Sequence, residues 1–273
     1  METRVETDPP RAAHTLVEMI VTVALLGLLV TFLAPALAGS RVGGRAAVCV
    51  QNTRRLNNAW TMYAQENHDQ LVQNFQGGLA QGGNFPAALG PAWASGWLDW
   101  STSADNTNRL LLVNERYAAL ARYLGPQASV FKCPADTDLS PLQKARGWTE
   151  RARSYSLSAG LGRGNAESGQ WDVIYRHATN VTDLVYPSPA ETFVYVDENS
   201  DSINDPAFYS PARASLSDIP AARHNGAAAF SFADGHAELH QWTGSLRHPS
   251  GQGPDPDLHW LSLHTQRTST LSY

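Results

Sequence analysis

Residues 19–38 read MIVTVALLGLLVTFLAPALA, a run of twenty residues without a charged side chain. A helix of that length crosses the hydrocarbon core of a bilayer, which is about 30 Å thick. A helix buried in a globular core normally has polar residues at every third or fourth position, whereas the polar side chains here are Thr22 and Thr31 alone. We therefore predict that the segment His14–Ala38 anchors the protein in a membrane.

Three kinds of anchor fit this segment: a signal peptide cleaved after Ala38, an ordinary signal anchor and a prepilin-type anchor. The run is longer than the 7–15 apolar residues of a usual signal peptide, and the leader 1–13 is not basic. Glu18 favours the prepilin type, because a carboxylate at the start of a spanning helix needs a cationic partner. Cleavage before His14 creates an α-amino group four residues from Glu18, and the amine of a neighbouring subunit can neutralise the carboxylate. The alternative places Glu18 at the interface of an uncleaved anchor.

The residues around this junction resemble the prepilin cleavage and methylation motif, which usually reads G-F-T-L-x-E. The chain reads AHTLVE over residues 13–18, so Thr15, Leu16 and Glu18 match, while Ala13 and His14 depart from the motif. Pro35 falls where many pilin helices have a bending proline.

The C-terminal half has a second signature, in which His224 is followed by nine residues and then by Asp234-Gly235. This pattern resembles prepilin-type proteins of the planctomycete and verrucomicrobial type, which pair it with the N-terminal motif. The resemblance extends through four further stretches: residues 96–100 (GWLDW), 131–136 (FKCPAD), 153–156 (RSYS) and 197–205 (DENSDSIND).

The resemblance implies a type II secretion pseudopilin-like fold of the α+β class, with a long N-terminal helix packed on an antiparallel sheet with large loop insertions. It implies a structural subunit rather than an enzyme, cut by prepilin peptidase after Ala13 and methylated on His14. Its partners would be other pilin or pseudopilin subunits in a type II secretion or type IV pilus-like assembly. The implied location is the inner membrane, with a single pass and a periplasmic or extracellular globular domain.

One charge pattern points the other way. Arg41 and Arg45 follow the apolar run, whereas the leader is net acidic. The positive-inside rule alone would place the C-terminal domain in the cytoplasm. Large domains can be translocated despite this bias, and we give the prepilin resemblance more weight.

The chain of 273 residues has a net charge of −5, with charges of both signs scattered along it. This distribution argues against nucleic acid as a partner. The spacing of Cys49 and Cys133 excludes a C-x-x-C motif. In an exported domain these cysteines can form a disulfide that contributes about 4–5 kcal/mol, and two buried free thiols are the alternative.

We expect five regions along the chain: a leader (1–13), a transmembrane stem helix (14–38), an amphipathic helix (39–69), an exported globular domain (70–243) and a tail (244–273). The amphipathic helix follows from apolar residues such as Val48, Leu56 and Tyr63 at helical spacing. The stem and the amphipathic helix form either one helix or two helices broken at residues 39–44, where three glycines lie.

The stretch 229–240 predicts a β-hairpin, because Asp234-Gly235 is a strong two-residue turn. That turn would pair Phe232 with Ala237 and Phe230 with Leu239. These four residues would then share the core face of the sheet. The polar residues Ser231, His236, Glu238 and His240 would share the other face.

Two stretches contain residues that can bind a metal ion. The oxygen-rich segment Asp197, Glu198, Asp201, Asn204 and Asp205 suits Ca²⁺, which many type II secretion pseudopilins hold in a C-terminal loop, and a solvated acidic turn is the alternative. A zinc site would instead need His224, His236, Glu238 and His240 to converge. His236 and His240 lie roughly 13 Å apart along a strand, too far to share an ion. We therefore expect His224 and Asp234 to fix loop geometry by hydrogen bonds.

No nucleophile elbow, phosphate loop or zinc-protease motif occurs in the sequence, and we predict no catalytic residues. The main alternative function is an anchored or secreted binding module, for example for polysaccharide, that uses Trp93, Trp97, Trp100 and Trp171. A metal-dependent hydrolase is a third, weaker alternative.

Overall fold

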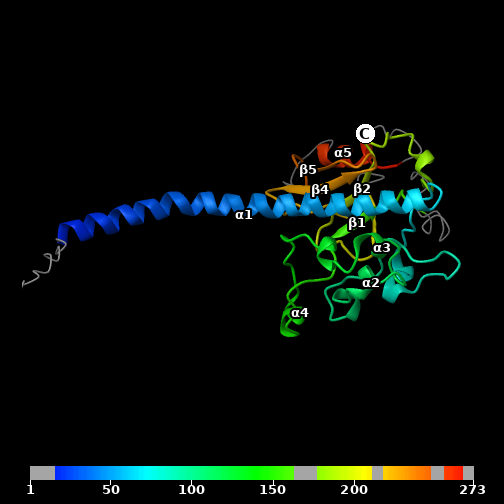
Figure 1. Ribbon diagram of the computed structural model, residues 1–273, viewed down its shortest axis with the longest axis horizontal. Coiled ribbons are helices and arrows are strands. Elements are labelled where there is room, and N and C mark those ends of the chain that lie inside the picture. The colour runs from blue at the N-terminus through cyan, green and yellow to red at the C-terminus, as the bar shows by residue number, and fades with distance from the viewer. Residues whose placement is uncertain (1–15, 163–176, 211–217, 247–254, 267–273) are drawn as a thin grey trace, which may run out of the picture. The chain divides into compact units, whose positions relative to one another are not determined.

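The computed structural model describes residues 16–162, 177–210, 218–246 and 255–266, apart from the side chains of residues 27 and 29–42 (Figure 1). The chain divides into two units, Met1–Gly43 and Gly44–Tyr273. The predicted cleavage site at Ala13 and His14 lies outside the described residues, and so does the side chain of Pro35.

Helix α1 spans Leu16–Glu66, so its bounds include the glycines at which two separate helices were the alternative. In the first unit, the described side chains from Leu16 to Leu28 are exposed, and Glu18 is the one charged residue among them. Among the described residues, no helical stretch is both long and apolar enough to cross a membrane.

The second unit contains a five-stranded sheet in the order β3-β1-β2-β4-β5. The strands are β1 (Tyr155–Ser158), β2 (Phe193–Asp197), β3 (Ala207–Phe208), β4 (Ala227–Phe232) and β5 (Ala237–Gln241). Neighbouring strands are antiparallel except for β1 and β3, which are parallel. The predicted α+β class is confirmed, but the expectation of a purely antiparallel sheet is wrong.

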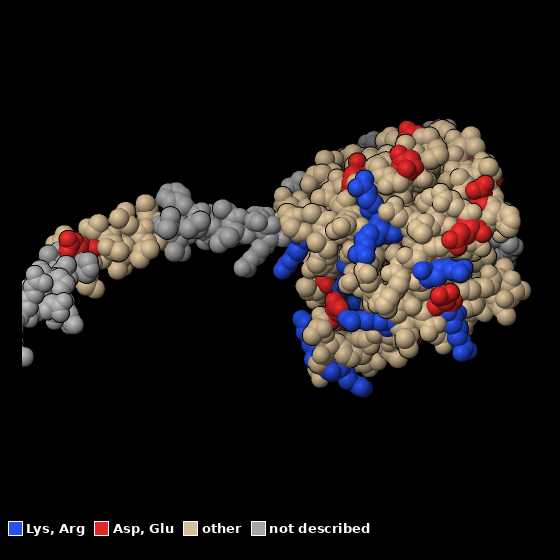
Figure 2. All heavy atoms as spheres, in the orientation of Figure 1, with Lys and Arg blue, Asp and Glu red and all other residues tan. Residues whose placement is uncertain are grey.

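Short helices complete this unit: α2 (Leu110–Val113), α3 (Ala121–Leu124), α4 (Pro141–Ala145) and α5 (Pro256–Leu263). Asp255 caps α5 by accepting a hydrogen bond from the backbone N–H of Asp257. On the face shown in Figure 2, acidic and basic side chains are interspersed over the described surface of this unit.

Successive side chains of a strand point to opposite faces of the sheet, so each face presents its own set of side chains for packing. Helices cover both faces of this sheet. On one face, Leu56 and Trp60 of α1 lie in the same buried cluster as Tyr155, Leu157 and Tyr195. The Asn57 side chain of α1 also donates to the Phe232 carbonyl at 2.9 Å. The part of α1 that follows Gly43 therefore belongs to the core of the second unit.

The opposite face packs against α5, which lies beside β4 and β5 (Figure 1). The buried cluster on this face includes Phe230 and Phe232 of β4, Leu261 of α5, and Trp242, which directly follows β5.

The predicted β-hairpin is present, but its register is shifted by one residue. Phe230 pairs with Glu238 and Ala229 with Leu239, and Gly235 has a φ of 99°. The turn has three residues, with glycine in the left-handed region, instead of two. Because side chains alternate with a period of two, the shift moves every β5 side chain to the opposite face, so Leu239 is partly exposed while His240 packs against α5.

Candidate functional site

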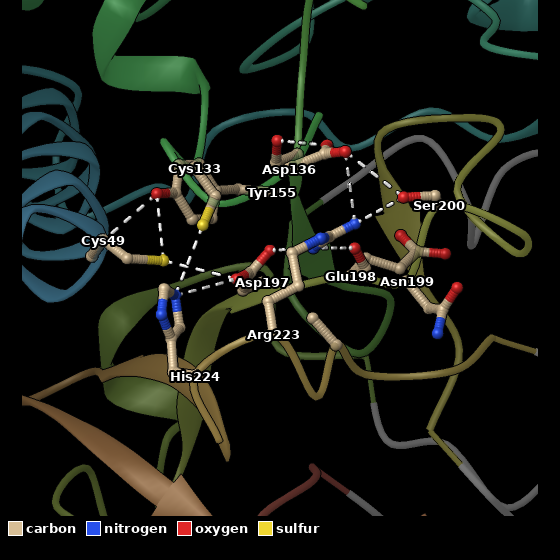
Figure 3. A network of polar contacts seen from close by, with 12 residues as sticks. Cys49, Cys133, Asp136, Tyr155, Asp197, Glu198, Asn199, Ser200, Arg223 and His224 are labelled. Atoms are coloured by element: carbon tan, nitrogen blue, oxygen red, sulfur yellow. Dashed lines mark hydrogen bonds and ion pairs between the residues drawn. The ribbon is translucent and has the colours of Figure 1, made fainter. Parts of the chain in front are cut away.

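A buried polar cluster lies between α1 and the sheet, and each of its residues comes from a different segment (Figure 3). Its members are Cys49 of α1, Cys133, Tyr155 at the start of β1, Asp197 at the end of β2, and His224 in the turn before β4. Tyr155 and Asp197 are directly opposite in the antiparallel β1–β2 pair. Cross-strand partners point to the same face, so both side chains lie on the α1 side.

The two sulfur atoms have different neighbours. Cys49 Sγ lies 3.3 Å from Asp197 Oδ2 and accepts a hydrogen bond from the Tyr155 hydroxyl at 3.2 Å. Cys133 Sγ lies 3.3 Å from His224 Nε2, and the same nitrogen is 3.6 Å from Asp197 Oδ2. Both thiols are free and fully buried in the structure.

Arg223 joins this cluster to a second group of polar residues. Its Nη1 donates to Asp197 Oδ1 at 2.6 Å and to the Glu198 carbonyl at 2.8 Å. Its Nη2 donates to Ser200 Oγ at 2.7 Å and lies 3.6 Å from Asp136 Oδ1. The guanidinium is therefore the counter-ion shared by two buried carboxylates.

Asp136 is paired from its other side as well. Lys132 Nζ lies 2.6 Å from Asp136 Oδ2, and the Ser154 hydroxyl donates to the same oxygen at 2.6 Å. Burial opposes ionisation of this carboxyl, but Arg223 and Lys132 outweigh burial and lower the pKa of Asp136 to about 2.

The cluster also changes the protonation of its own members. Burial disfavours the imidazolium, but hydrogen bonds with Asp197 and Cys133 raise the pKa of His224 to about 9. A hydrogen bond from Cys49, with a smaller contribution from His224, lowers the pKa of Cys133 to about 7. Burial, then the Cys133 contact and the Asp197 carboxylate, raise the pKa of Cys49. The two pKa shifts have opposite directions, and each favours the charged form of its group, the Cys133 thiolate and the His224 imidazolium.

Four residues of the cluster can offer ligand atoms to one metal ion: Cys49, Cys133, Asp197 and His224. Their sulfur, nitrogen and oxygen atoms all lie within 4.8 Å of one another. Among the described His, Cys, Asp and Glu residues, these four form the one group that is close enough to hold an ion. None of the four side chains is more than 5 % exposed. A nucleophile needs access to its substrate, so this arrangement suits a structural role better than a catalytic one.

The residues predicted to bind calcium face different partners in the structure. Asp197 belongs to the cluster, whereas Glu198 accepts hydrogen bonds from Ser156 at 2.5 Å and Ser202 at 2.9 Å. The two carboxylate oxygens of Asp205 accept from the backbone N–H groups of Gly77 and Ala207.

The remaining two residues of that set are Asp201 and Asn204, and the Asn204 side chain accepts a hydrogen bond from the backbone N–H of Asp205. Asp201 is exposed, and Asn204 contributes its carbonyl to Arg153 and Leu98. Among the described His, Cys, Asp and Glu residues, the four carboxylates of this set do not form one group of potential ligands, so calcium at this segment stays a prediction from the sequence alone.

The histidines near the C-terminus also separate. His236 Nδ1 lies 2.6 Å from Asp234 Oδ1 within the turn, and His240 stacks on Trp260 with ring centroids 3.6 Å apart. Asp234 thus fixes its own turn by accepting a hydrogen bond from the backbone N–H of His236, whereas His224 lies in the buried cluster beside Cys133. Glu238 is exposed.

The sequence draws attention to the members of the cluster one by one, but it does not predict that they meet. The sequence predicts either a disulfide or two buried free thiols for Cys49 and Cys133, a calcium ligand at Asp197 and a residue that fixes loop geometry at His224. The available signal was that Cys133, Tyr155, Asp197 and His224 each belong to a separate stretch of the prepilin-type resemblance. Arg223, which precedes His224, was missed altogether.

Comparison of the chain with protein-family models, with curated proteins and with solved structures finds no match.

Proposed function

We propose that the protein is a pilin-like structural subunit, made as a prepilin, cut before His14 and assembled through α1 into a type II secretion or type IV pilus-like structure. The observation that supports this proposal most strongly is the apolar surface at the start of α1. Leu16, Val17 and Val23 are 76 %, 68 % and 66 % exposed, and the apolar side chains lie around the whole helix. Water is a poor solvent for such a surface, which lipid or the helices of other subunits would cover.

The second part of α1 supports the same proposal. The residues from Gly44 to Glu66 pack on the sheet, and Leu56, Ala59 and Trp60 are almost fully buried there. One helix thus combines an apolar segment that needs an apolar environment with a segment held firmly in a globular domain. This combination resembles the stem of a pilin.

Glu18 gives the proposal its assembly chemistry. It is the acidic residue in the first turn of α1, within the apolar segment. A carboxylate in an apolar environment is stabilised by a cation, and the α-amino group that cleavage would create on a neighbouring subunit is such a cation. The proposed product is therefore inserted in the inner membrane by its helix and passes from there into a filament.

The Glu18→Ala variant, expressed in the native host, tests this proposal. We expect it to accumulate in the membrane fraction and to be depleted from sheared filaments, because the apolar helix remains while the charge for subunit docking is lost. Glu66→Ala is the matched control, since Glu66 lies at the other end of the same helix and contacts Tyr123 in the globular domain. Filaments that contain Glu18→Ala at the level of Glu66→Ala would contradict the proposal.

A second candidate function is an anchored binding module, favoured by an open pocket of about 470 Å³. The pocket is lined by an indole and several polar groups, including Trp100, Asp138, Lys144, Asn199 and Asp201. An aromatic ring beside carboxylate and amide groups suits a sugar. Screening the full chain and its Trp100→Ala variant against an oligosaccharide array tests this function. The unsubstituted chain should bind an oligosaccharide, and the variant should not.

The other tryptophans of the binding-module prediction contribute less. Trp93 is fully buried and stacks on Phe131 with ring centroids 6.0 Å apart, so it serves the core. Trp97 is half-buried, and Trp171 lies outside the described residues. The hydrolase alternative requires His224, His236, Glu238 and His240 to converge, whereas His224 lies beside Cys133 in the buried cluster and His240 stacks on Trp260.

A further inference from the structure

We propose that the buried cluster binds one tetrahedral transition-metal ion of the zinc class, which joins α1 to the sheet through four ligands: Cys49, Cys133, Asp197 and His224. This inference goes beyond the proposed function, because it concerns what holds the globular unit together and requires no filament.

The spacing of the ligand atoms fits such an ion. With Zn–S bonds of about 2.3 Å and Zn–N or Zn–O bonds of about 2.0–2.1 Å, tetrahedral ligand atoms lie about 3.3–3.8 Å from one another. Cys49 Sγ and Asp197 Oδ2 are 3.3 Å apart, Cys133 Sγ and His224 Nε2 are 3.3 Å apart, and His224 Nε2 and Asp197 Oδ2 are 3.6 Å apart. These three of the six edges of a tetrahedron lie within that range, and all four ligand atoms lie within 4.8 Å of one another, so small side-chain adjustments would suffice to surround an ion.

The donor types select the class of ion. Two thiolate sulfurs and one imidazole nitrogen suit Zn²⁺ and its soft or borderline relatives, whereas Ca²⁺ and Mg²⁺ prefer oxygen ligands alone. Four protein ligands complete a tetrahedron and leave no position for water or substrate. The burial of all four side chains agrees with a closed, structural site.

The charges of the neighbouring groups balance when the ion is present. Two thiolates and the Asp197 carboxylate contribute three negative charges, and a divalent ion contributes two positive charges. The Arg223 guanidinium, 2.6 Å from Asp197 Oδ1, contributes the third positive charge. Buried charge is tolerated where it is paired in this way.

Two contacts outside the ligand set orient the ligands. Arg223 holds Oδ1 of Asp197, which leaves Oδ2 directed at the sulfur and nitrogen atoms. The Tyr155 hydroxyl donates to Cys49 Sγ at 3.2 Å, which fixes the position of that sulfur (Figure 3). Such supporting contacts are a regular feature of metal sites, and removing one lowers metal affinity about 10- to 100-fold.

The origin of the ligands gives the ion its role. Cys49 belongs to α1, Asp197 ends β2 and His224 precedes β4. Ligands from segments that meet only in the folded chain couple metal binding to folding. The ion would therefore fasten the helix that contains the apolar segment to the globular domain.

The competing outcome is a disulfide between Cys49 and Cys133, which would consume two of the four ligands. The test uses the full chain, purified in detergent from the native host without reductant or chelator. We expect one zinc per chain by elemental mass spectrometry and two free thiols by alkylation after denaturation. Replacement of the zinc by Co²⁺ should give the visible absorption of a tetrahedral site and a thiolate-to-Co²⁺ charge-transfer band.

Variants assign these signals to the proposed ligands. Cys133→Ser and His224→Gln should lose the bound metal, and Tyr155→Phe should keep it with about 10- to 100-fold lower affinity. Ser154→Ala is the matched control, because it removes a buried hydroxyl that contacts Asp136 and no ligand. Wild-type protein that is folded but metal-free, a Cys49–Cys133 disulfide in it, or an unchanged Co²⁺ spectrum in Cys133→Ser would each overturn the proposal.

Discussion

Arg223 forms an ion pair with Asp197 of the buried cluster, with Nη1 2.6 Å from Oδ1. The second oxygen of the same carboxylate lies 3.3 Å from the sulfur of Cys49 on α1. The Arg223–Asp197 pair thus links the network around Asp136 to the contact between α1 and the sheet.

The Arg223→Met variant should destabilise the globular unit by about 3–5 kcal/mol, because it leaves two buried carboxylates, Asp197 and Asp136, without their shared cation. Chemical denaturation followed by tryptophan fluorescence measures this loss. The control is Arg109→Ala, whose ion pair with Glu150 is largely exposed and contributes about 0–1 kcal/mol. Equal losses in the two variants would contradict the role given to Arg223.

The contact between α1 and the sheet can be tested with two substitutions in one helix. Leu56 is fully buried against the sheet, whereas Met62 is 46 % exposed. We expect Leu56→Ala to lower the free energy of unfolding by about 2–5 kcal/mol, from lost burial and the remaining cavity. Met62→Ala should change it by less than about 0.5 kcal/mol. A small effect of Leu56→Ala would mean that the helix is not part of the core.

His240 predicts a loss of stability in acid. Burial, with a smaller contribution from His264, lowers the pKa of His240 from 6.5 to about 4, and the Asp257 carboxylate opposes the shift. A histidine with a depressed pKa stabilises the fold above its unfolded pKa, and this contribution is lost as the pH falls. The free energy of unfolding should therefore fall by about 2–3 kcal/mol between pH 6.5 and pH 4, with allowance for partial solvent screening.

The His240→Phe variant isolates this contribution, because phenylalanine keeps the stacking on Trp260 but cannot be protonated. Over the same pH range, the free energy of unfolding of this variant should fall by about 2–3 kcal/mol less than that of the wild-type protein. Identical pH profiles of the two proteins, measured by urea denaturation, would assign the acid sensitivity to other groups.

Chelators distinguish the two metal ions considered for this chain. A zinc-selective chelator should lower the melting temperature, because it would remove the proposed ion between Cys49, Asp197 and His224. A calcium-selective chelator should leave it unchanged, since Glu198 and Asp205 already accept hydrogen bonds from the protein's own donors. The opposite result would favour the calcium loop predicted from residues 197–205.

Much of the fold follows from patterns within single segments. The helical spacing of Leu56 and Tyr63 predicted the part of α1 that packs on the sheet, and Asp234-Gly235 predicted the hairpin. The register was wrong because a three-residue turn with Gly235 in the left-handed region is as compatible with the sequence as a two-residue turn. The parallel strand β3 has two residues, too few for any periodicity.

The cluster was beyond prediction for a different reason. Its ligands lie far apart in the chain, and only the β1–β2 register places Asp197 opposite Tyr155 and beneath α1. Seen in the sequence, Asp197 is the first residue of an acidic stretch, and oxygen-rich stretches favour calcium. The tertiary fold turns its side chain away from that stretch and toward the two cysteines.

The most direct test of the proposed function is the intact mass and N-terminal sequence of the protein extracted from membranes of its native host. We expect a mature chain that begins at His14, with the mass of one added methyl group on its α-amine. A chain that begins at Gly39, or one that retains residues 1–13, would contradict processing as a prepilin.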